Sequence, residues 1–289
     1  MNTILLIDDD PIILSMLVSF LSCPEYKIYT ADSAKAAFKI LEDMKPDLIV
    51  SDIMMPDMDG YEMRRQLLND ERLKFVPFIF LSSKGESQDI VKGMEMKVDD
   101  YIAKPFDSSV LKAKIKAVLQ RYDGLYKLIH YDQLTGLYNR RALEMFLFEE
   151  LERAKRYKRP LGIVLLDLDH FKNLNDKFGH DFGDNVLKIT ADILKANVRE
   201  IDYAGRYGGE EFIIIMPETG QEDTRAVAER LRLAVQQLEF DNPDVSITIS
   251  GGIAIAMKDG DNTADLLKSA DIALYNAKNN GRNLIRGRE

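Results

Sequence analysis

The first part of the chain alternates short apolar runs with longer amphipathic segments. Apolar or β-branched residues fill five runs: residues 3–7, 27–30, 48–51, 77–81 and 100–102. Apolar residues at helical spacing fill the segments between them: Ile12–Leu21, Ser33–Met44, Gly60–Leu68 and Gln88–Met96. This alternation is typical of a doubly wound parallel sheet. We therefore predict an α/β domain with a parallel five-stranded sheet over residues 1–120.

An apolar stripe continues beyond the fifth run. Asp107, Ser108 and Ser109 are residue types that commonly begin helices. Apolar side chains then recur at alternating steps of four and three residues: Leu111, Ile115, Val118, Tyr122, Leu125 and Ile129. This spacing predicts a coiled-coil-like helical connector over residues 107–130, overlapping the last helix of the first domain. We expect its first half to pack on that domain's sheet and its second half to pair with another copy, giving a homodimer.

The second part of the chain has a different pattern. An amphipathic helix is predicted over Ala142–Arg159, and the unbroken apolar runs Gly162–Leu166 and Ile213–Met216 are typical of buried strands. Gly208 and Gly209 precede the second run and predict a tight hairpin turn, because glycine adopts dihedrals that few other residues tolerate. We assign residues 131–289 to a second domain.

Composition narrows the class of protein. The 289 residues suffice for two ordinary domains, and the hydrophobic fraction of 46% is that of a globular protein. Apolar runs stay well below the roughly 20 residues that cross a membrane, and the amino terminus resembles a first strand rather than a signal peptide. A single cysteine, Cys23, fits a reducing cytoplasm. The net charge of −9 argues against nucleic-acid binding. We expect a cytoplasmic protein that binds neither membranes nor nucleic acid.

Five polar residues stand at the ends of the first domain's predicted strands: Asp8, Asp9, Asp52, Ser82 and Lys104. Ligands of such sheets bind beyond the carboxyl ends of the strands. Carboxylates that converge at one edge repel each other unless a cation or protons neutralise them, and a lysine and a hydroxyl beside them suit an exchanging anion. Any one of these residues alone could be a helix cap or a surface residue, but their shared position favours a site.

Four segments resemble the response-regulator receiver family: Leu6–Pro11, Ser51–Gly60, Leu81–Ser83 and Asp100–Phe106. The resemblance implies that Asp52 accepts a phosphoryl group from a histidine kinase. It also implies that Mg²⁺, or Mn²⁺ in its place, is held by Asp8, Asp9, Asp52 and the Met54 carbonyl. Lys104 would pair with a phosphoryl oxygen, and Ser82 and Tyr101 would move together as the switch. The family often has a cis peptide where this chain has Lys104–Pro105.

The second domain has its own acidic cluster. The buried run Gly162–Leu166 ends in Asp167, and Glu210 and Glu211 follow the glycine turn. If the run Ile213–Met216 pairs beside Gly162–Leu166, Asp167 comes near both glutamates. Carboxylates from two elements, near a basic residue such as Lys172, suit metal-bound phosphates.

Five segments of the second domain resemble the GGDEF family of diguanylate cyclases: Asp132–Arg140, Asp167–Asp176, Gly179–Asp184, Gly208–Phe212 and Ala277–Asn283. The signature here is Gly-Gly-Glu-Glu-Phe. The resemblance implies an α/β domain with a central, mostly antiparallel sheet, and an enzyme that condenses two GTP into cyclic di-GMP with release of two pyrophosphates. Because the product joins two GMP units, two domains would have to face each other, with Asp52 phosphorylation controlling their approach.

The resemblance also assigns roles to single residues. Two Mg²⁺ or Mn²⁺ ions would be held by Asp167, the Leu168 carbonyl, Glu210 and Glu211, and one of the glutamates would help to deprotonate the ribose 3′-hydroxyl. Asn175 and Asp184 would read the guanine edge, with His180 nearby. The triphosphate would lie against the Phe171 backbone and the glycines Gly208 and Gly209, held by Lys172, Lys278 and Arg282.

A further motif lies upstream of the turn. Arg199 and Asp202 form an Arg-x-x-Asp sequence, and five residues separate it from Gly208. At this spacing the GGDEF family has an inhibitory site for its product, and Arg230, on the predicted helix Thr224–Leu238, would complete it. The alternative is an ion pair at a helix end.

Two other functions fit parts of this sequence but not the whole of it. A catalytically inactive cyclic di-GMP receptor would use Arg199 and Asp202, but such receptors usually lack metal ligands that this chain retains. A DNA-binding response regulator is disfavoured by the acidic charge. The sequence leaves open whether phosphorylation assembles dimers or rearranges them.

Overall fold

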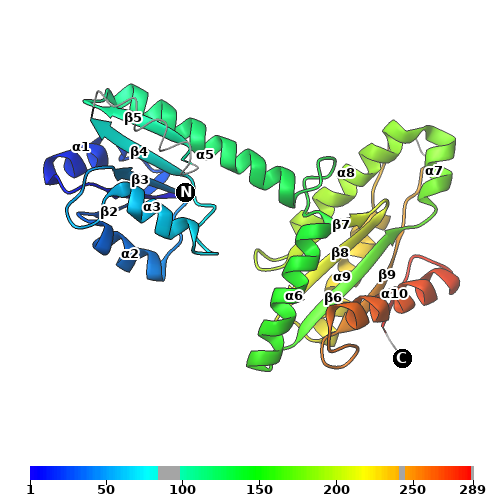
Figure 1. The fold of residues 1–289 in the computed structure, drawn as a ribbon. Helices are drawn as coiled ribbons and strands as arrows, with labels where there is room; N and C mark the ends of the chain where they lie inside the picture. Colours follow the sequence, from blue (N-terminus) through cyan, green and yellow to red (C-terminus); the bar gives the residue numbers. More distant parts are fainter. Residues whose placement is uncertain (84–97, 241–244, 288–289) are drawn as a thin grey trace. The chain divides into compact units, whose positions relative to one another are not determined.

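The computed structural model describes residues 1–83, 98–240 and 245–287 (Figure 1). The chain divides into two compact units, Met1–Leu125 and Tyr126–Glu289. The helix expected over Gln88–Met96 lies outside the described residues. Among the helices described, none combines the length and the apolar character needed to cross a membrane.

The first unit contains a five-stranded parallel sheet (Figure 1). Its strands are β1 Asn2–Ile7, β2 Tyr26–Ala31, β3 Leu48–Asp52, β4 Phe78–Ser83 and β5 Asp100–Lys104. They lie in the order β2-β1-β3-β4-β5, and every neighbouring pair is parallel. This confirms the predicted sheet, and it brings the carboxyl ends of β1, β3, β4 and β5 to one edge.

Helices cover both faces of this sheet: α1 Pro11–Leu21, α2 Ala34–Asp43, α3 Gly60–Leu68 and the first half of α5 Ser108–His130. Side chains alternate along each strand, so Ile4 faces α1 and α5 whereas Leu5 faces α2 and α3. Asp10 and Ser33 cap α1 and α2 by accepting backbone hydrogen bonds. These caps fix the turns that follow β1 and β2.

Helix α5 contains the whole apolar stripe, and the boundary between the two units falls within it. Leu111, Ile115 and Val118 are buried in the core of the first unit, which confirms that the first half packs inward. Leu125 and Ile129 are 47% and 48% exposed. Their pairing with another chain remains a prediction.

The second unit contains a mixed five-stranded sheet. Its strands are β6 Leu161–Leu168, β7 Tyr203–Gly208, β8 Glu211–Pro217, β9 Ile249–Ile255 and β10 Ile285–Gly287. The order is β10-β9-β6-β8-β7, with antiparallel pairs throughout except for the parallel pair of β9 and β10. The mostly antiparallel sheet is therefore confirmed.

Helices again cover both faces: α6 Arg140–Tyr157, α7 Phe171–Phe178, α8 His180–Asn197, α9 Gln221–Gln236 and α10 Thr263–Asn279. Val164 and Leu166 of β6 pack in one core with α8 and α9. Ile163 and Leu165 pack in the other core with α6 and α10. Strand β6 is thus buried on both sides, which explains its unbroken apolar run, and only its carboxyl end reaches a polar region.

Candidate functional site

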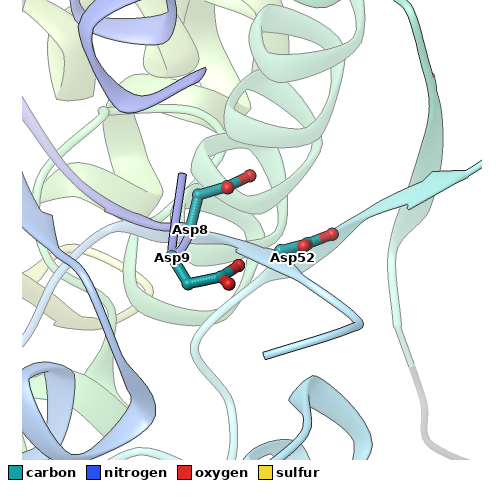
Figure 2. Close-up of side chains that lie close together, drawn as sticks. All are labelled: Asp8, Asp9 and Asp52. Carbon is teal, nitrogen blue, oxygen red and sulfur yellow. The ribbon is translucent and has the colours of Figure 1, made fainter. Parts of the chain in front are cut away.

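Three aspartates meet at the carboxyl edge of the first sheet. Asp8 and Asp9 directly follow β1, and Asp52 ends the adjacent strand β3. Figure 2 shows the three side chains projecting from these neighbouring strand ends. Their carboxylate oxygens lie within 4.8 Å of one another, and in the described part of the chain this is the one acidic group so tightly gathered. Clustered carboxylate oxygens are the donors that a hard divalent cation prefers.

Lys104, at the end of β5, lies between two of these acids. Its Nζ is 2.7 Å from Oδ2 of Asp8 and 3.0 Å from Oδ1 of Asp52. Burial raises the pKa of the Asp52 carboxyl, and the charge of Asp8 adds to this while Lys104 opposes it. Burial lowers the pKa of Lys104, but the two carboxylates outweigh burial and the pKa is raised. The sheet therefore brings Asp8 and Asp52 to the Lys104 ammonium group, with Asp9 beside the two acids.

The predicted switch residues lie close by on the sheet. Ser82 is half-buried on β4, where it pairs with Ala103, the residue before Lys104. The Tyr101 ring packs on Phe80, with ring centroids 5.7 Å apart. Met54, proposed to use its carbonyl, follows β3, and its side chain is exposed. The Lys104–Pro105 peptide is cis, as expected.

In the second unit, a tight hairpin brings three acids to the end of β6. Gly208 pairs with Glu211, so Gly209 and Glu210 form the loop, and Gly209 has a φ of +43°. On the other side of β8, the register sets Glu211 directly opposite Asp167. The amide of Leu168 donates to the Glu210 carbonyl at 3.3 Å. The expected pairing of Ile213–Met216 with Gly162–Leu166 is confirmed.

These acids raise one another's proton affinity. Burial raises the pKa of Asp167, and Glu210 adds to this, while Lys278 opposes it with Nζ 2.8 Å from Oδ2. Burial also raises the pKa of Glu211, and the charge of Asp167 adds to it. Carboxylates that are crowded and partly buried favour a compensating cation, so this donor set fits a divalent metal ion.

A cavity of about 240 Å³ opens beside this cluster. Its lining combines acids, bases and the start of α7: Asp167, Leu168, Asp169, His170, Phe171, Lys172, Asn173, Glu210, Lys278 and Arg282. The lining includes Lys172, Lys278 and Arg282, the three side chains predicted to hold the triphosphate. The first amides of a helix have no intrahelical partners and favour anions, which adds to this positive charge.

The residues predicted to read the base lie outside that lining, on α7 and α8. Oδ1 of Asn175 is buried, and it has no hydrogen-bond partner among the described residues. It fits there because Gly183 has no side chain: a Cβ atom on Gly183 would lie 1.8 Å from it. His180 and Asp184 are exposed on the first turns of α8. A buried acceptor of this kind suits a ligand that donates a hydrogen bond.

Arg199 and Asp202 lie in the turn after α8. The backbone amide of Arg199 donates to Oδ2 of Asp202 at 2.9 Å. Oδ1 of Asp202 is buried and lacks a hydrogen-bond partner within the described ranges. Burial raises the pKa of Asp202, and Arg199 and Arg230 oppose the rise. Arg230 donates to the Asn197 carbonyl at 2.6 Å, so it reaches this turn from α9.

Comparison with known families decides the class of the protein. Residues 4–116 match the response regulator receiver domain, and residues 129–284 match the diguanylate cyclase, GGDEF domain. The chain belongs to the GGDEF family. Its first unit is a receiver domain and its second unit is a GGDEF domain. Domains of both families are typically metal-dependent, in agreement with the carboxylate sets described above.

Two named relatives are similar to this chain over most of its length. The response regulator PleD of Caulobacter vibrioides is 34% identical over 299 residues, covering 99% of this chain. The present chain spans 65% of PleD's length. A diguanylate cyclase of Vibrio cholerae is 30% identical over 258 residues, covering 89% of this chain and 78% of that protein.

Solved structures are similar to the GGDEF domain. The GGDEF domain of DgcB from Caulobacter crescentus, in complex with c-di-GMP, is 30% identical with a TM-score of 0.53. It covers 55% of this chain and 95% of its own. The active GGEEF domain of a Vibrio cholerae diguanylate cyclase is 36% identical with a TM-score of 0.51, covering 52% and 97%.

The GGDEF hairpin has a support that the sequence analysis missed. Arg206 donates from Nε to the Gly209 carbonyl at 2.8 Å, and its Nη1 lies 3.3 Å from Oδ1 of Asp132. Asp132 also accepts from the hydroxyl of Thr135 at 2.7 Å. Burial alone would raise the pKa of Asp132, but the bonds from Thr135 and Arg206 outweigh it and lower the pKa. The first motif of the domain thus braces the turn that presents Glu210.

A second missed residue is Asp169, which lines the cavity two positions after Asp167. Alternate residues of an extended chain lie on the same side, so the pair Asp167 and Asp169 carried a signal that the analysis did not use.

Proposed function

We propose that the protein is a diguanylate cyclase controlled by phosphorylation of its receiver domain. It condenses two GTP into cyclic di-GMP and releases two pyrophosphates. The observation that carries the proposal is the register that sets Glu211 opposite Asp167, beside Lys278 and a cavity lined with basic residues. The similarity to bacterial diguanylate cyclases supports it.

The chain's own residues would bind and orient GTP at this edge. Lys172, Lys278 and Arg282 hold the triphosphate, and the Phe171 backbone and the bare turn Gly208–Gly209 let it approach closely. Two Mg²⁺ or Mn²⁺ ions, held by Asp167, the Leu168 carbonyl, Glu210 and Glu211, would neutralise charge on the reacting phosphates. Glu210 or Glu211 accepts the proton of the attacking 3′-hydroxyl.

Guanine selection is assigned to Asn175 and Asp184, with His180 beside them. The buried Oδ1 of Asn175 would accept from the base, and Asp184 would accept from the ring N–H and the exocyclic amino group. Adenine offers a different pattern of donors, and a site that leaves polar groups unpaired with the wrong base discriminates strongly.

The stoichiometry calls for a homodimer. Each site holds one GTP, so two domains that face each other present both attacks at once. The exposed apolar side chains in the second half of α5 support pairing there: Leu125, Tyr126, Leu128 and Ile129. The chain spans 65% of the length of PleD, so similarity to PleD does not by itself establish the activity. Dimerisation and cyclase activity are therefore both part of what we propose.

Control would enter at the receiver domain. A histidine kinase supplies the phosphoryl group, and Asp52 accepts it beside the cation held by Asp8, Asp9 and the Met54 carbonyl. Lys104 pairs with the new anion, and Ser82 and Tyr101 move towards it. A phosphodonor kinase and GTP both fit the cytoplasmic location that the single cysteine suggests.

The product would limit its own synthesis at Arg199, Asp202 and Arg230. The unpartnered Oδ1 of Asp202 suits a guanine donor, and the two arginines suit phosphate. Replacing Arg199 with alanine should remove the plateau in product accumulation, followed by chromatography over time. Arg156→Ala, an exposed arginine on α6, is the matched control and should keep the plateau. A plateau retained in the Arg199→Ala variant contradicts this site.

The function itself is tested with the full chain, GTP and Mg²⁺, with and without beryllofluoride as a phosphoryl mimic. Cyclic di-GMP that rises with the mimic, and does not rise in an Asp52→Asn variant, supports both the activity and its control. Equal product in both arms keeps the cyclase and rejects Asp52 as the switch. Absence of product favours the alternative, an inactive cyclic di-GMP receptor, which titration of cyclic di-GMP against the wild type and Arg199→Ala would then test.

A further inference from the structure

The turn that follows α10 has an unusual backbone. Gly281, Arg282 and Asn283 have φ values of +110°, +59° and +47°. Residues with a side chain rarely adopt this left-handed conformation, and two in succession need an outside restraint. The turn also brings Arg282 to the lining of the GTP cavity. The contacts that restrain this turn therefore also position Arg282, a residue predicted to bind the triphosphate.

Asp169 provides one restraint. Its Oδ2 accepts from the backbone amide of Asn283 at 3.0 Å and from the hydroxyl of Thr248 at 2.7 Å. Its Oδ1 accepts from the hydroxyl of Ser250 at 2.7 Å. Its own amide donates to the Thr248 carbonyl at 2.9 Å. Asp169 thus ties the end of β6 and the segment leading into β9 to the turn after α10.

Arg232 of α9 provides a second restraint. Its Nη1 donates to Oδ1 of Asn283 at 2.8 Å, and its Nε donates to Glu229 at 2.7 Å. The backbone amide and the side chain of Asn283 are therefore held from two different elements. Arg282, between this anchored residue and Gly281, belongs to the lining of the cavity.

Asp169 and Asp167 differ in the partners of their carboxylate oxygens. Both carboxylate oxygens of Asp169 accept hydrogen bonds from the protein itself, and the residue is 9% exposed. The Asp167 carboxylate has Lys278 at one oxygen and faces Glu211 across the sheet. A buried carboxylate whose two oxygens both accept hydrogen bonds from the protein is suited to fixing geometry rather than to binding a ligand.

We propose that Asp169 is a positioning residue for the triphosphate: through Asn283 it holds the turn that presents Arg282. The role rests on the proposed function, since it assumes that GTP occupies the cavity. Asp169 does not touch the nucleotide. Its removal lets the turn relax towards ordinary dihedrals and moves Arg282 away from the phosphates.

A double-mutant cycle in the full-length protein tests this role. Asp169→Ala should raise KM for GTP about tenfold, the cost of one lost charge-assisted contact, with a smaller change in kcat. In an Arg282→Ala background the same substitution should raise KM less than about twofold, because the group it positions is gone. Asp169→Asn should stay near the wild type, since its amide oxygen still accepts from Asn283 and the Ser250 hydroxyl turns to accept.

Binding measurements separate positioning from general damage. In titration calorimetry, Asp169→Ala should weaken the binding of GTP and leave the affinity for GMP unchanged, because GMP lacks the phosphates that Arg282 holds. Ser250→Ala is the matched control: it removes a hydrogen bond to Oδ1 of Asp169 and spares the bond to Asn283. If Asp169→Ala does not fold, Arg232→Ala removes the other restraint on Asn283. That variant should also weaken the binding of GTP more than the binding of GMP.

Equal effects of Asp169→Ala with and without Arg282, or equal weakening of GTP and GMP, would overturn the proposal. A wild type that makes no cyclic di-GMP defeats the proposed function instead, and the comparison of GTP with GMP still decides the role of Asp169.

Discussion

The two acidic sites of the molecule both combine buried carboxylates with a lysine, but they differ in how closely these groups are packed. In the receiver domain, Lys104 lies between Asp8 and Asp52, and the three aspartates gather their oxygens within 4.8 Å. In the GGDEF domain, Lys278 contacts Asp167, and the site opens into a cavity of about 240 Å³. Buried carboxylates, a lysine and strand ends therefore do not by themselves define the ligand.

The difference follows from how each sheet delivers its acids. Neighbouring parallel strands end at the same edge, about 4.8 Å apart, so acids that follow them converge. In the antiparallel sheet, Asp167 ends a strand whereas Glu210 and Glu211 come from a hairpin, and the lysine comes from the last turn of a helix. The first arrangement gathers carboxylate oxygens around a small space, and the second opens into the cavity where we propose that the nucleotide binds.

Single substitutions of an acid in each site should separate chemistry from control, with the largest effect in the GGDEF domain. Glu211→Gln should lower cyclic di-GMP formation by roughly 100-fold or more, because it removes a proposed metal ligand beside the phosphates. Asp52→Asn should leave the unstimulated rate within about twofold, since the reaction occurs elsewhere. Product chromatography with and without beryllofluoride measures both. An active Glu211→Gln variant would remove the distinction between the two sites.

Replacing the lysine of each site should show how much the packing of its acids contributes to the stability of the domain. Lys104→Ala leaves Asp8 and Asp52, 1% and 7% exposed, without their counter-charge. We expect the receiver domain to lose about 2–4 kcal/mol of unfolding free energy in the absence of Mg²⁺. Lys278→Ala should cost the GGDEF domain less, about 1 kcal/mol, because that lysine is more exposed and pairs with one acid.

Hydrogen exchange resolved by domain would measure both losses, because the two units need not unfold together. Lys116→Ala, on the exposed side of α5, is the control for the first variant. A larger loss for Lys278→Ala than for Lys104→Ala would show that crowding does not decide the stability of these sites.

The smallest effect concerns the brace of the GGDEF hairpin. The pKa of Asp132 is lowered in the folded state, so its charged form stabilises the fold above the unfolded pKa, roughly pH 4, and this stabilisation is lost as the pH falls through the lowered value. The difference in unfolding free energy between the wild type and Asp132→Asn should therefore be largest near neutral pH and shrink below pH 4.

Urea unfolding at several pH values follows this difference, with Asp192→Asn, an exposed acid on α8, as the control. A difference that grows on acidification would have the wrong sign for a carboxylate stabilised in its charged form.

Much of both sites could be predicted from the sequence because strand ends carry the residues. Parallel strands placed Asp8, Asp52 and Lys104 at one edge, and the pairing of two apolar runs placed Asp167 beside Glu211. The apolar stripe of α5 was also informative, but its even spacing could not show where burial ends. That limit depends on where the receiver sheet stops covering the helix.

Contacts between distant loops could not be predicted in this way. Asp169 bonds to Asn283 across 114 residues, and Arg206 reaches Asp132 across 74. Such bonds depend on how helices pack and where turns close, and they leave no periodic pattern. Arg199 and Asp202 illustrate the same limit: their spacing also allowed a helical ion pair, whereas the backbone amide of Arg199 is the group that bonds to the carboxylate.

The register of β8 restricts which changes this segment of the chain can accept. In one register, β8 sets Glu211 opposite Asp167 and also places Phe212 and Ile214 in the core. A residue inserted between Glu211 and the buried run would keep one of these placements and break the other, since each step along a strand exchanges the two faces. Replacing one acid with another therefore preserves this register, whereas an insertion or a deletion there breaks it.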